Sequence, residues 1–557
     1  MKLVECVPNF SEGRDGAVID AIVVAIASAE GAHVLDVDPG RDTNRTVVTC
    51  VAPLEHMIEA AFRGIAKAAE LIDMSQHHGQ HPRMGATDVC PFVPLGTTTM
   101  DECVALARAL GERVGQELEI PVYLYEYAAT QDDRRNLADI RAGEYEGLPE
   151  KLANPQWKPD FGPSKMNARA GATVIGARKF LIAYNVNLNT RDKKKASDIA
   201  LAIREQGRKA RDAHGRFIRD MNGDFIYEAG TLKACKAVGW YIDEYQRAQV
   251  SINLTDFDVT PPHVAFEEAS KQAAERGLRA TGSELVGLIP LAAMRRAGEY
   301  YLEKQGASTG VPEPMLIETA IQSLGLRELG GFDPMQKIIE YRVAEDSPLA
   351  SSPLREFVDL TSTDAPVPGG GSVAALCGSL AAALTAMVAN LTFGKKGYET
   401  VSSEMNALAS DAQAIKAEFV RAVDDDARAF DAVMAANRLP KSTHDEQSRR
   451  EHAIQAATKT AIDVPLRVMR LCEQAVPLVE RAAEKGNKNS ISDAGVAALV
   501  LHAAVKGAWL NVLINLPGLP GDQSGPVRTE ANGIADRVGE QALQITRRVA
   551  EGLLKGR

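Results

Sequence analysis

Cysteine patterns that build disulfide frameworks or zinc ribbons are absent from the chain. Its 557 residues include seven cysteines, an odd number that contains no CxxC pair. Scattered cysteines of this kind are typical of reduced thiols in a cytosolic protein. We therefore expect a cytoplasmic chain without disulfides.

An excess of positive charge is absent as well. The chain carries 63 Lys and Arg residues against 74 Asp and Glu residues, which gives a formal net charge of −11. Because no overall basic field exists to hold nucleic acid or an anionic membrane, we expect neither as a partner. A local basic pocket for a small anion is compatible with this balance.

Long hydrophobic runs are scarce. The opening segment, MKLVECVPNFSEGRD, is interrupted by a proline and two glutamates, so we do not expect a signal peptide. The longest uncharged stretch, 373–391, approaches the ~20 residues of a membrane span. It is rich in alanine and contains Ser379, Thr385 and Asn390, which favours a buried helix of a bundle over a membrane helix.

Composition and length favour a multidomain globular protein. The hydrophobic share of 45% and the charged share of 25% are close to the average of globular proteins. Single hydrophobic cores stop growing near about 250–300 residues, so a chain of 557 residues predicts at least two domains.

Short β-type runs alternate with amphipathic segments in the first half of the chain. The first six predicted elements have the order βαββαβ, which is the split βαβ layout. They are a strand over 3–10, a helix over 17–29, strands over 33–38 and 44–52, a helix over 54–72 and a strand over 88–95. A helix over 101–117 and a strand over 121–127 follow.

The same order recurs from residue 172. Its elements are a strand over 172–188, a helix over 196–205, strands over 235–242 and 248–259, a helix over 262–276 and a strand over 284–291. We therefore predict two tandem βαββαβ-like α+β subdomains, at 1–171 and 172–342, with a ligand cleft between them. The segment 208–231 interrupts the second subdomain and is expected to be a surface excursion.

A change in composition follows a polar, proline-punctuated linker at 343–353. Almost nothing beyond this linker has a strand pattern, and alanine-rich helical segments follow one another. The breaks between them fall at 394–397, 437–443, 484–489 and 515–522. We predict an all-α helical bundle domain over 354–557.

The loop MSQHHGQHPRMGATD contains three histidines, His77, His78 and His81, between a predicted helix and a predicted strand. Functional side chains often lie in such loops. Three interpretations stay open: the histidines are solvated, they bind a metal together with a carboxylate such as Asp88, or one of them is a general acid–base catalyst.

The segment PVPGGGSVAALCGSL opens a predicted helix, with Ser372 as its N-cap. Exposed amides at this helix start would suit an anionic group. The alternative is that the small residues serve only close helix packing. The segment lacks the GK[ST] of a P-loop, so we do not expect a bound nucleotide.

Three consecutive aspartates, Asp424, Asp425 and Asp426, lie in a predicted helix. At about 100° per residue, its apolar side chains form one arc. This arc consists of Phe419, Val423, Ala427, Phe430 and Met434. Asp426 falls within about 60° of the centre of the arc, whereas the other two aspartates fall well outside it. We expect Asp426 to be the buried member, with a raised pKa suited to proton donation. An edge residue that caps a neighbour is the alternative.

Long motifs along the chain resemble one known family. The motifs LVECVPNFSEG, LDVD, TNRTV, HHGQHPRMGATDVCPF, RAGEYEGLPEKL, WKPDFGPS, GARKFLIAYNVNLNT, VGWYIDE and ELVGLIPL resemble the formiminotransferase domain of formimidoyltransferase-cyclodeaminase. The motifs PGGGSVAAL, VDDDARAF, RLPKST and NVLINL resemble its cyclodeaminase domain. The resemblance covers nearly the whole chain and departs from the vertebrate-like pattern by extra residues around 211–228.

The resemblance implies a bifunctional folate enzyme of histidine degradation. The first domain would transfer the formimino group from N-formimino-L-glutamate to N5 of tetrahydrofolate and release L-glutamate. The second would close 5-formiminotetrahydrofolate to 5,10-methenyltetrahydrofolate and release ammonia. Tetrahydrofolate, with a polyglutamylated tail, would be a co-substrate of a homo-oligomer, and we expect neither a metal nor a nucleotide as cofactor.

The motifs also imply site residues. The transferase histidine of the family matches His81, and its cyclodeaminase aspartate matches Asp426, which the helical phase selects independently. Asp38, in the strand HVLDVD, is a candidate to fix the tautomer of His81. The folate-binding stretch consists of Gly162, Pro163, Ser164, Lys165, Met166, Asn167, Ala168, Arg169, Ala170 and Gly171. A candidate patch for the anionic tail, or else a solvated helix start, consists of Arg191, Lys193, Lys194 and Lys195.

Three alternatives stay open at this point. The chain retains only one of the two reactions, or it is a degenerate folate-binding scaffold fused to a helical scaffold. The third alternative is a metal hydrolase built on the histidine loop.

The linker predicts that the two architectures are separable. Residues 1–342 and 343–557, expressed alone, should each fold and keep their own reaction, because each has its own pattern of elements. Glutamate release is measured for the first fragment and ammonia release for the second, each with its substrates supplied. Two soluble, folded fragments without either activity would contradict the predicted division.

Overall fold

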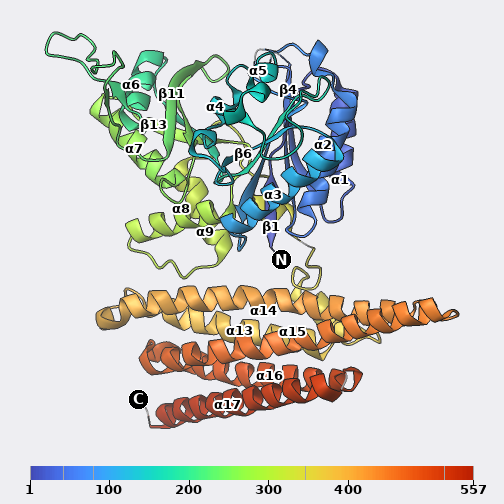
Figure 1. Ribbon diagram of the computed structural model, residues 1–557. Helices are drawn as coiled ribbons and strands as arrows, with labels where there is room; N and C mark the ends of the chain where they lie inside the picture. Colours follow the sequence, from blue (N-terminus) through green and yellow to red (C-terminus); the bar gives the residue numbers. More distant parts are fainter. Residues whose placement is uncertain (1, 42, 80, 345, 520, 556–557) are drawn as a thin grey trace. The chain divides into compact units, whose positions relative to one another are not determined.

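A computed structural model describes residues 2–41, 43–79, 81–344, 346–519 and 521–555 (Figure 1). The chain forms two compact units, one of Met1–Ala297 and Ala320–Ala344, the other of Gly298–Thr319 and Glu345–Arg557. Sheets with covering helices make up the first unit and long helices the second. The predicted fold class, tandem α+β subdomains followed by an all-α bundle, is therefore confirmed. Glu345 of the predicted linker lies outside the described residues.

A seven-stranded sheet begins the first unit. Its strands are β1 (Leu3–Cys6), β2 (Asn9–Phe10), β3 (His33–Gly40), β4 (Arg45–Pro53), β5 (Thr87–Leu95), β6 (Val122–Glu126) and β7 (Thr173–Ala177). β1 and β2 lie on one line between β4 and β5, so the order across the sheet is β3-β4-β1/β2-β5-β7-β6.

The helices α1 (Gly16–Ala27), α2 (Met57–Leu71) and α3 (Met100–Glu117) share a hydrophobic core with this sheet. Successive strand residues point to opposite faces. Val48 and Cys50 of β4 therefore enter the core beneath the helices, whereas Arg45, Val47 and Thr49 face the other side. That other side carries the first candidate site.

A four-stranded sheet follows in the order β11-β12-β8-β13. Its elements are β8 (Ile182–Leu188), α6 (Lys193–Ile203), β11 (Cys235–Ile242), β12 (Arg247–Leu254), α7 (Pro262–Glu275) and β13 (Ala280–Val286). The order matches β3-β4-β1-β5 of the first sheet, so the predicted recurrence of the βαββαβ layout is confirmed. β7 was placed wrongly: it pairs in parallel with β5 and β6, so the second sheet begins at β8 and not at residue 172.

The predicted surface excursion contains a repeat that the sequence analysis missed. Two eight-residue copies, RDAHGRFI and RDMNGDFI, occupy 211–226 between β9 (Arg208–Lys209) and β10 (Tyr227–Glu228). In the first copy the Arg211 guanidinium lies 4.0 Å from the ring centroid of Phe217, and in the second Arg219 lies 3.8 Å from Phe225. The excursion projects from the second subdomain at the upper left of Figure 1.

Five long helices form the bundle of the second unit. They are α13 (Gly370–Asn390), α14 (Ser402–Asn437), α15 (His444–Lys485), α16 (Ile491–Asn515) and α17 (Gly521–Leu554), preceded by the short α12 (Leu354–Thr361). All four predicted breaks separate consecutive helices, so the segmentation of the bundle is confirmed. Residues 298–319, which include the second half of α8 (Leu291–Lys304) and the loop after it, group with this bundle. Within this group the Asn390 side chain donates to Gly310 O at 2.7 Å.

The predicted buried helix is α13, which packs against α14 and α16. Its small residues permit close packing: a Cβ on Gly378 would lie 2.4 Å from the Phe419 ring. By length and composition, Gly370–Asn390 and Lys488–Gly518 both meet the criteria for a membrane-crossing helix, with 61% and 39% of their apolar windows buried inside the protein. Core helices of globular proteins meet the same criteria, so these two segments are weak support for a membrane span.

Candidate functional site

The histidine loop lies beside the predicted folate-binding stretch. Gly85 and Gly171 form an antiparallel bridge, and the amide of Ala86 donates to the carbonyl of Ala170 at 2.9 Å. Gly171 has a φ of +69°, and a Cβ there would lie 2.2 Å from Met84 O. Only glycine permits this approach. The structure therefore brings together two motifs that are separated by more than seventy residues in the sequence.

His81 is half-buried between a carbonyl and a guanidinium. Its Nδ1 lies 2.6 Å from Pro82 O, and Nη1 of Arg45 contacts both ring nitrogens. A consistent arrangement has Nδ1–H donating to Pro82 O while Nε2 accepts from Arg45. Burial, and then the charge of Arg45, lower the pKa of His81. The imidazole is therefore neutral near pH 7 and can act as a base.

Arg45 is itself held by polar groups of neighbouring strands. Its Nε donates to Asn9 Oδ1 at 2.9 Å, and its Nη1 lies 3.8 Å from the carboxylate of Asp88. Asp88 is buried, and it also accepts from Arg141 and from the amide of Met84. Burial lowers the pKa of Arg45 to about 10, with Asp88 opposing the change. The sequence analysis missed Arg45, although the motif TNRTV contains it.

Asp38 lies on the same sheet face as Arg45 without contacting His81. On β3 it pairs with Val47 of β4, two residues from Arg45, and its side chain is exposed. Among the described residues, no hydrogen bond joins Asp38 to His81. The ring nitrogen that would fix the tautomer, Nδ1, is bonded to Pro82 O instead. The structure therefore does not bring Asp38 to His81, and the tautomer role of Asp38 stays a prediction.

Two of the side chains proposed as metal ligands, His77 and Asp88, are bound to other groups of the protein. His77 is buried, with Nε2 at 2.9 Å from Asn44 O and Nδ1 accepting from Arg83. Asp88 is engaged by arginines, which also makes it unsuited to bind a metal with His81. In the part of the chain that the structure describes, no group of three His, Cys, Asp or Glu side chains is placed to hold a metal ion.

Two cavities adjoin this face. One of about 450 Å³ is lined by the histidine loop and the RAGEYEG motif, where Arg83 pairs with Glu146 at 2.7 Å. The other, about 190 Å³, lies between the two α+β subdomains and is lined by Glu5 and Arg178 among others. Burial raises the pKa of Glu5 to about 7. Sequence reasoning missed Glu5, because a glutamate in a strand is usually solvated.

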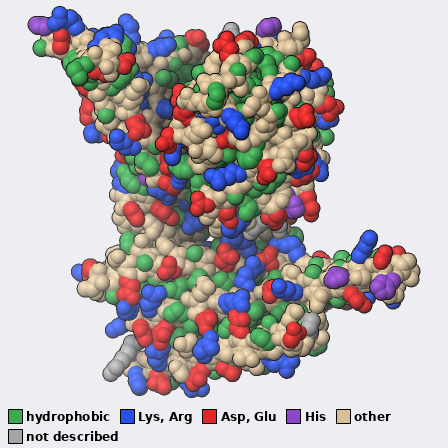
Figure 2. Space-filling model, in the orientation of Figure 1, with side chains coloured by type: hydrophobic (Ala, Val, Ile, Leu, Met, Phe, Trp, Pro, Cys, Tyr) green, Lys and Arg blue, Asp and Glu red, His purple; other side chains and the backbone are tan. Residues whose placement is uncertain are grey.

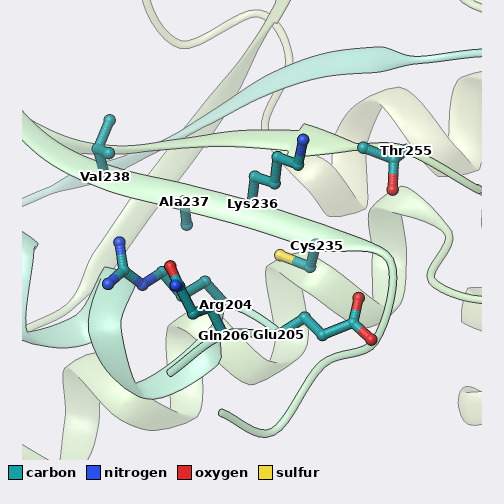
Figure 3. A pocket seen from close by; sticks show the side chains of 8 residues that line it. All are labelled: Arg204, Glu205, Gln206, Cys235, Lys236, Ala237, Val238 and Thr255. Atoms are coloured by element: carbon teal, nitrogen blue, oxygen red, sulfur yellow. The ribbon is translucent and has the colours of Figure 1, made fainter. Parts of the chain in front are cut away.

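A further cavity lies apart from the predicted residues. It has a volume of about 540 Å³ and lies at the end of α6 beside β11, where Arg204, Glu205 and Lys236 line it (Figure 3). The candidate basic patch of Arg191, Lys193, Lys194 and Lys195 lies at the opposite end of α6, where all four residues are exposed, as expected of a solvated helix start.

The second candidate site is built around the aspartate triplet of α14, whose members have different partners. Asp424 is only 2% exposed and accepts from the amides of Leu349 and Ala350. Asp425 pairs with Arg428 and Arg467 near the surface. Asp426 is half-buried and faces the start of α13.

The predicted helical phase is therefore only partly right. Asp426 does face a neighbouring helix, but the expectation that Asp424 lies outside the buried side is wrong, because the segment before α12 covers it. The predicted apolar arc also fails at its end, since Phe430 and Met434 are each 38% exposed.

Asp426 is cradled by the first turn of α13. Ser372 Oγ lies 3.1 Å from Asp426 Oδ2 and 2.9 Å from Val423 O. A Cβ on Gly371 would lie 2.0 Å from Asp426 Oδ1, so the glycine makes room for the carboxyl group. The prediction that Ser372 is the N-cap is wrong, because α13 begins at Gly370 and its N-cap is Gly369.

Burial raises the pKa of Asp426, although hydrogen bonds from the side chain and backbone of Ser372 oppose the change. A hydroxyl has one hydrogen. When Ser372 donates it to Val423 O, its oxygen is free to accept a proton from a neutral Asp426. Asn511 of the NVLINL motif lies beside Gly370, which brings a third motif to this site.

Comparison with known proteins identifies the family. Three family profiles match: "Formiminotransferase domain, N-terminal subdomain" over residues 3–178, "Formiminotransferase domain" over 183–344 and "Formiminotransferase-cyclodeaminase" over 353–528. Formimidoyltransferase-cyclodeaminase of Rattus norvegicus is 46% identical over 524 residues, which cover 94% of each chain. The chain belongs to the formimidoyltransferase-cyclodeaminase family.

Two shorter relatives each align with one part of this chain. Glutamate formimidoyltransferase of Thermoplasma acidophilum is 46% identical over 312 residues, 56% of this chain and 95% of the relative. Methenyltetrahydrofolate cyclohydrolase of Methylorubrum extorquens is 45% identical over 166 residues, 30% of this chain and 80% of the relative. The resemblance inferred from the motifs is confirmed.

Arg45 should control the protonation of His81 in this family member. Replacing Arg45 with Met removes a positive charge beside the ring, so the pKa of His81 should rise and the neutral imidazole should persist over a narrower pH range. The pH dependence of His81 modification by diethyl pyrocarbonate, followed by peptide mass spectrometry, measures this shift. Arg63→Met, on the surface of α2, is the control and should leave the pH dependence unchanged. An unaltered profile in Arg45→Met would contradict the assigned contact.

Proposed function

We propose that the chain is a bifunctional folate enzyme of histidine degradation. Its first domain transfers the formimino group from N-formimino-L-glutamate to N5 of tetrahydrofolate and releases L-glutamate. Its second domain closes 5-formiminotetrahydrofolate to 5,10-methenyltetrahydrofolate and releases ammonia. The observation that carries this proposal is that His81 and Asp426 each lie where their family motifs converge, in surroundings that favour a base and an acid respectively.

His81 acts as a proton shuttle in the first reaction. N5 attacks the formimino carbon and loses a proton to Nε2 of the neutral imidazole. The imidazolium then returns the proton to the departing glutamate nitrogen. Arg45 has to leave Nε2 when substrate binds, and its charge keeps the ring neutral until then. Asp38 lies on the same face, where its carboxylate can attract a cationic formimino group.

Asp426 acts as the acid in the second reaction. N10 attacks the formimino carbon, and its proton passes to the imino nitrogen, which becomes an amino group. The C–N bond to this amino group then breaks as its nitrogen takes a further proton from the Asp426 carboxyl and leaves as ammonia. Ammonia is a poor leaving group without that proton. The raised pKa keeps a larger share of Asp426 protonated near neutral pH than an exposed aspartate would be.

Both reactions are tested together by mixing the purified chain with formiminoglutamate and tetrahydrofolate. Glutamate, ammonia and methenyltetrahydrofolate should appear in equal amounts at completion. Release of glutamate without ammonia would show that the chain has only the transferase activity. Release of ammonia only when 5-formiminotetrahydrofolate is supplied would show that it has only the cyclodeaminase activity.

Replacing His81 with Ala should slow glutamate release by roughly 10²–10⁴-fold, the usual contribution of general acid–base catalysis. Cyclisation of supplied 5-formiminotetrahydrofolate should continue, because Asp426 belongs to the other domain. A chelator should alter neither step. Activity that is lost on chelation and restored by zinc would support the metal hydrolase instead.

Replacing Asp426 with Asn preserves shape but removes the carboxylic proton. Glutamate release should keep a near-normal initial rate, and 5-formiminotetrahydrofolate should accumulate with little ammonia beyond uncatalysed cyclisation. Asp425→Asn, whose side chain faces the surface arginines, is the control and should behave like the unmodified chain. Loss of ammonia release in the control but not in Asp426→Asn would contradict the assignment.

A second candidate activity of the helical domain is hydrolysis of 5,10-methenyltetrahydrofolate to 10-formyltetrahydrofolate. The relative named methenyltetrahydrofolate cyclohydrolase favours it, because it aligns with this domain at 45% identity. The chemistry is related: water adds to the methenyl carbon and releases one proton to solvent. The bond between this carbon and N5 then breaks as the hydroxyl proton passes to N5 through Asp426. Purified chain should then accelerate the decay of methenyltetrahydrofolate absorbance in ammonia-free buffer, and Asp426→Asn should not.

The proposal includes a cytoplasmic homo-oligomer that takes polyglutamylated folate. Reduced, scattered cysteines support the compartment. Exposed apolar side chains on α13, at its C-cap and on α16 support association between copies: these are Leu380, Met387, Leu391, Val496, Leu499, Leu510 and Ile514. The exposed Lys165 and Arg169 of the folate-binding stretch support an anionic tail. Light scattering and competition by folates of increasing tail length test these points.

A further inference from the structure

The 346–350 segment, which precedes α12, is hydrogen-bonded to α14, the helix that carries Asp426. The amides of Leu349 and Ala350 donate to the two carboxylate oxygens of Asp424 at 2.9 and 3.0 Å. Ser351 donates its own amide to Ser347 O at 2.9 Å, so this segment forms one helical turn. Both donor amides therefore point in the same direction, toward α14.

The contact is buried and complete. Asp424 is 2% exposed, and each of its oxygens has a backbone donor. A buried carboxylate of this kind needs such partners, and loss of one leaves polar groups unsatisfied. Arg428 adds a second tie to the same segment by donating to Asp346 O at 3.2 Å.

The turn that carries Asp426 is thus held from two sides. On one side, Ser372 of α13 donates to Val423 O and contacts Asp426. On the other side, the 346–350 segment binds Asp424, which precedes Asp426 by two residues. Because helix geometry fixes the angle between residues two positions apart, a rotation of this turn would move both carboxyl groups together.

We infer that Asp424 is a positioning residue for the cyclodeaminase reaction, and that the 346–350 segment completes the second site by fixing the turn of α14 that presents Asp426 to α13. The inference rests on the proposed cyclodeaminase function. Asp424 acts through Asp426 and does not touch the substrate.

Asp425 provides a matched comparison within the same triplet. Its carboxylate pairs with Arg428 and Arg467, and its side chain is 24% exposed. Ion pairs near the surface contribute little to stability. Asp425→Asn therefore removes the same charge as Asp424→Asn, one residue closer to Asp426, and keeps both amide bonds from the 346–350 segment to Asp424.

Three full-chain variants test the inference: Asp424→Asn, Ala350→Pro and Asp425→Asn. Ala350→Pro deletes one donor amide from the opposite partner and leaves the charge of Asp424 in place. Rates of ammonia release are measured with supplied 5-formiminotetrahydrofolate. Glutamate release from formiminoglutamate reports on the first domain, and circular dichroism reports on helix content.

Asp424→Asn and Ala350→Pro should lower kcat for ammonia release by about 10- to 100-fold, the scale expected when a catalytic group is displaced by about 1 Å. KM should stay within about twofold, since the substrate contacts are untouched, and glutamate release should not change. Asp425→Asn should keep the kcat of the unmodified chain.

Three outcomes would overturn the inference. One is an unchanged kcat in Ala350→Pro with normal helix content, which decides the matter even if Asp424→Asn fails to fold. Another is an equal loss of kcat in Asp425→Asn, which would show that the negative charge matters and the position of Asp424 does not. The third is a rise in KM at constant kcat. Absence of ammonia release from the unmodified chain would instead overturn the proposed function.

Discussion

Burial of an ionisable side chain is the constraint on which both sites depend. Removal from water disfavours the charged form, so it lowers the pKa of an imidazole and raises that of a carboxylic acid. At His81 burial lowers the pKa and favours the neutral base, and at Asp426 it raises the pKa and favours the protonated acid. One physical effect thus prepares opposite chemistry in two unrelated folds. The polar groups around each site, Arg45 in one and Ser372 in the other, adjust the effect without reversing it.

Glycine makes both arrangements possible. The bridge between Gly85 and Gly171 brings the histidine loop against the predicted folate-binding stretch, and Gly371 leaves room for the Asp426 carboxyl group. A methyl group at either Gly171 or Gly371 would overlap a neighbouring oxygen. Gly85 of the motif HPRMG and Gly371 of the motif PGGGS therefore mark close approaches of the chain.

Sequence reasoning was most accurate where structure depends on local pattern. The βαββαβ order and all four breaks between bundle helices follow from periodicity and turn residues. It failed where distant segments meet. β7 has the pattern of any buried strand, and nothing in residues 173–177 tells which sheet it joins. Asp424 seemed exposed because a helical wheel assumes one buried side, whereas α14 is covered on two sides. Arg45 was missed for the same reason, since its contacts come from three separate segments.

The repeat in the surface excursion bears on how such chains change length. Each copy of RDxxGxFI closes its own turn, through a bond from its first arginine to the carbonyl of its glycine. The last residue of each copy bonds to the residue eight positions earlier: the amide of Ile218 donates to Ala210 O, and the amide of Ile226 donates to Ile218 O. The amide of Ala210 in turn donates to Ile226 O at 2.8 Å, so these three bonds close a ring among residues 210, 218 and 226 next to the short strands β9 and β10. Two copies are thus what the ring needs, and a chain with a single copy would leave backbone groups of the residue before the repeat without these partners.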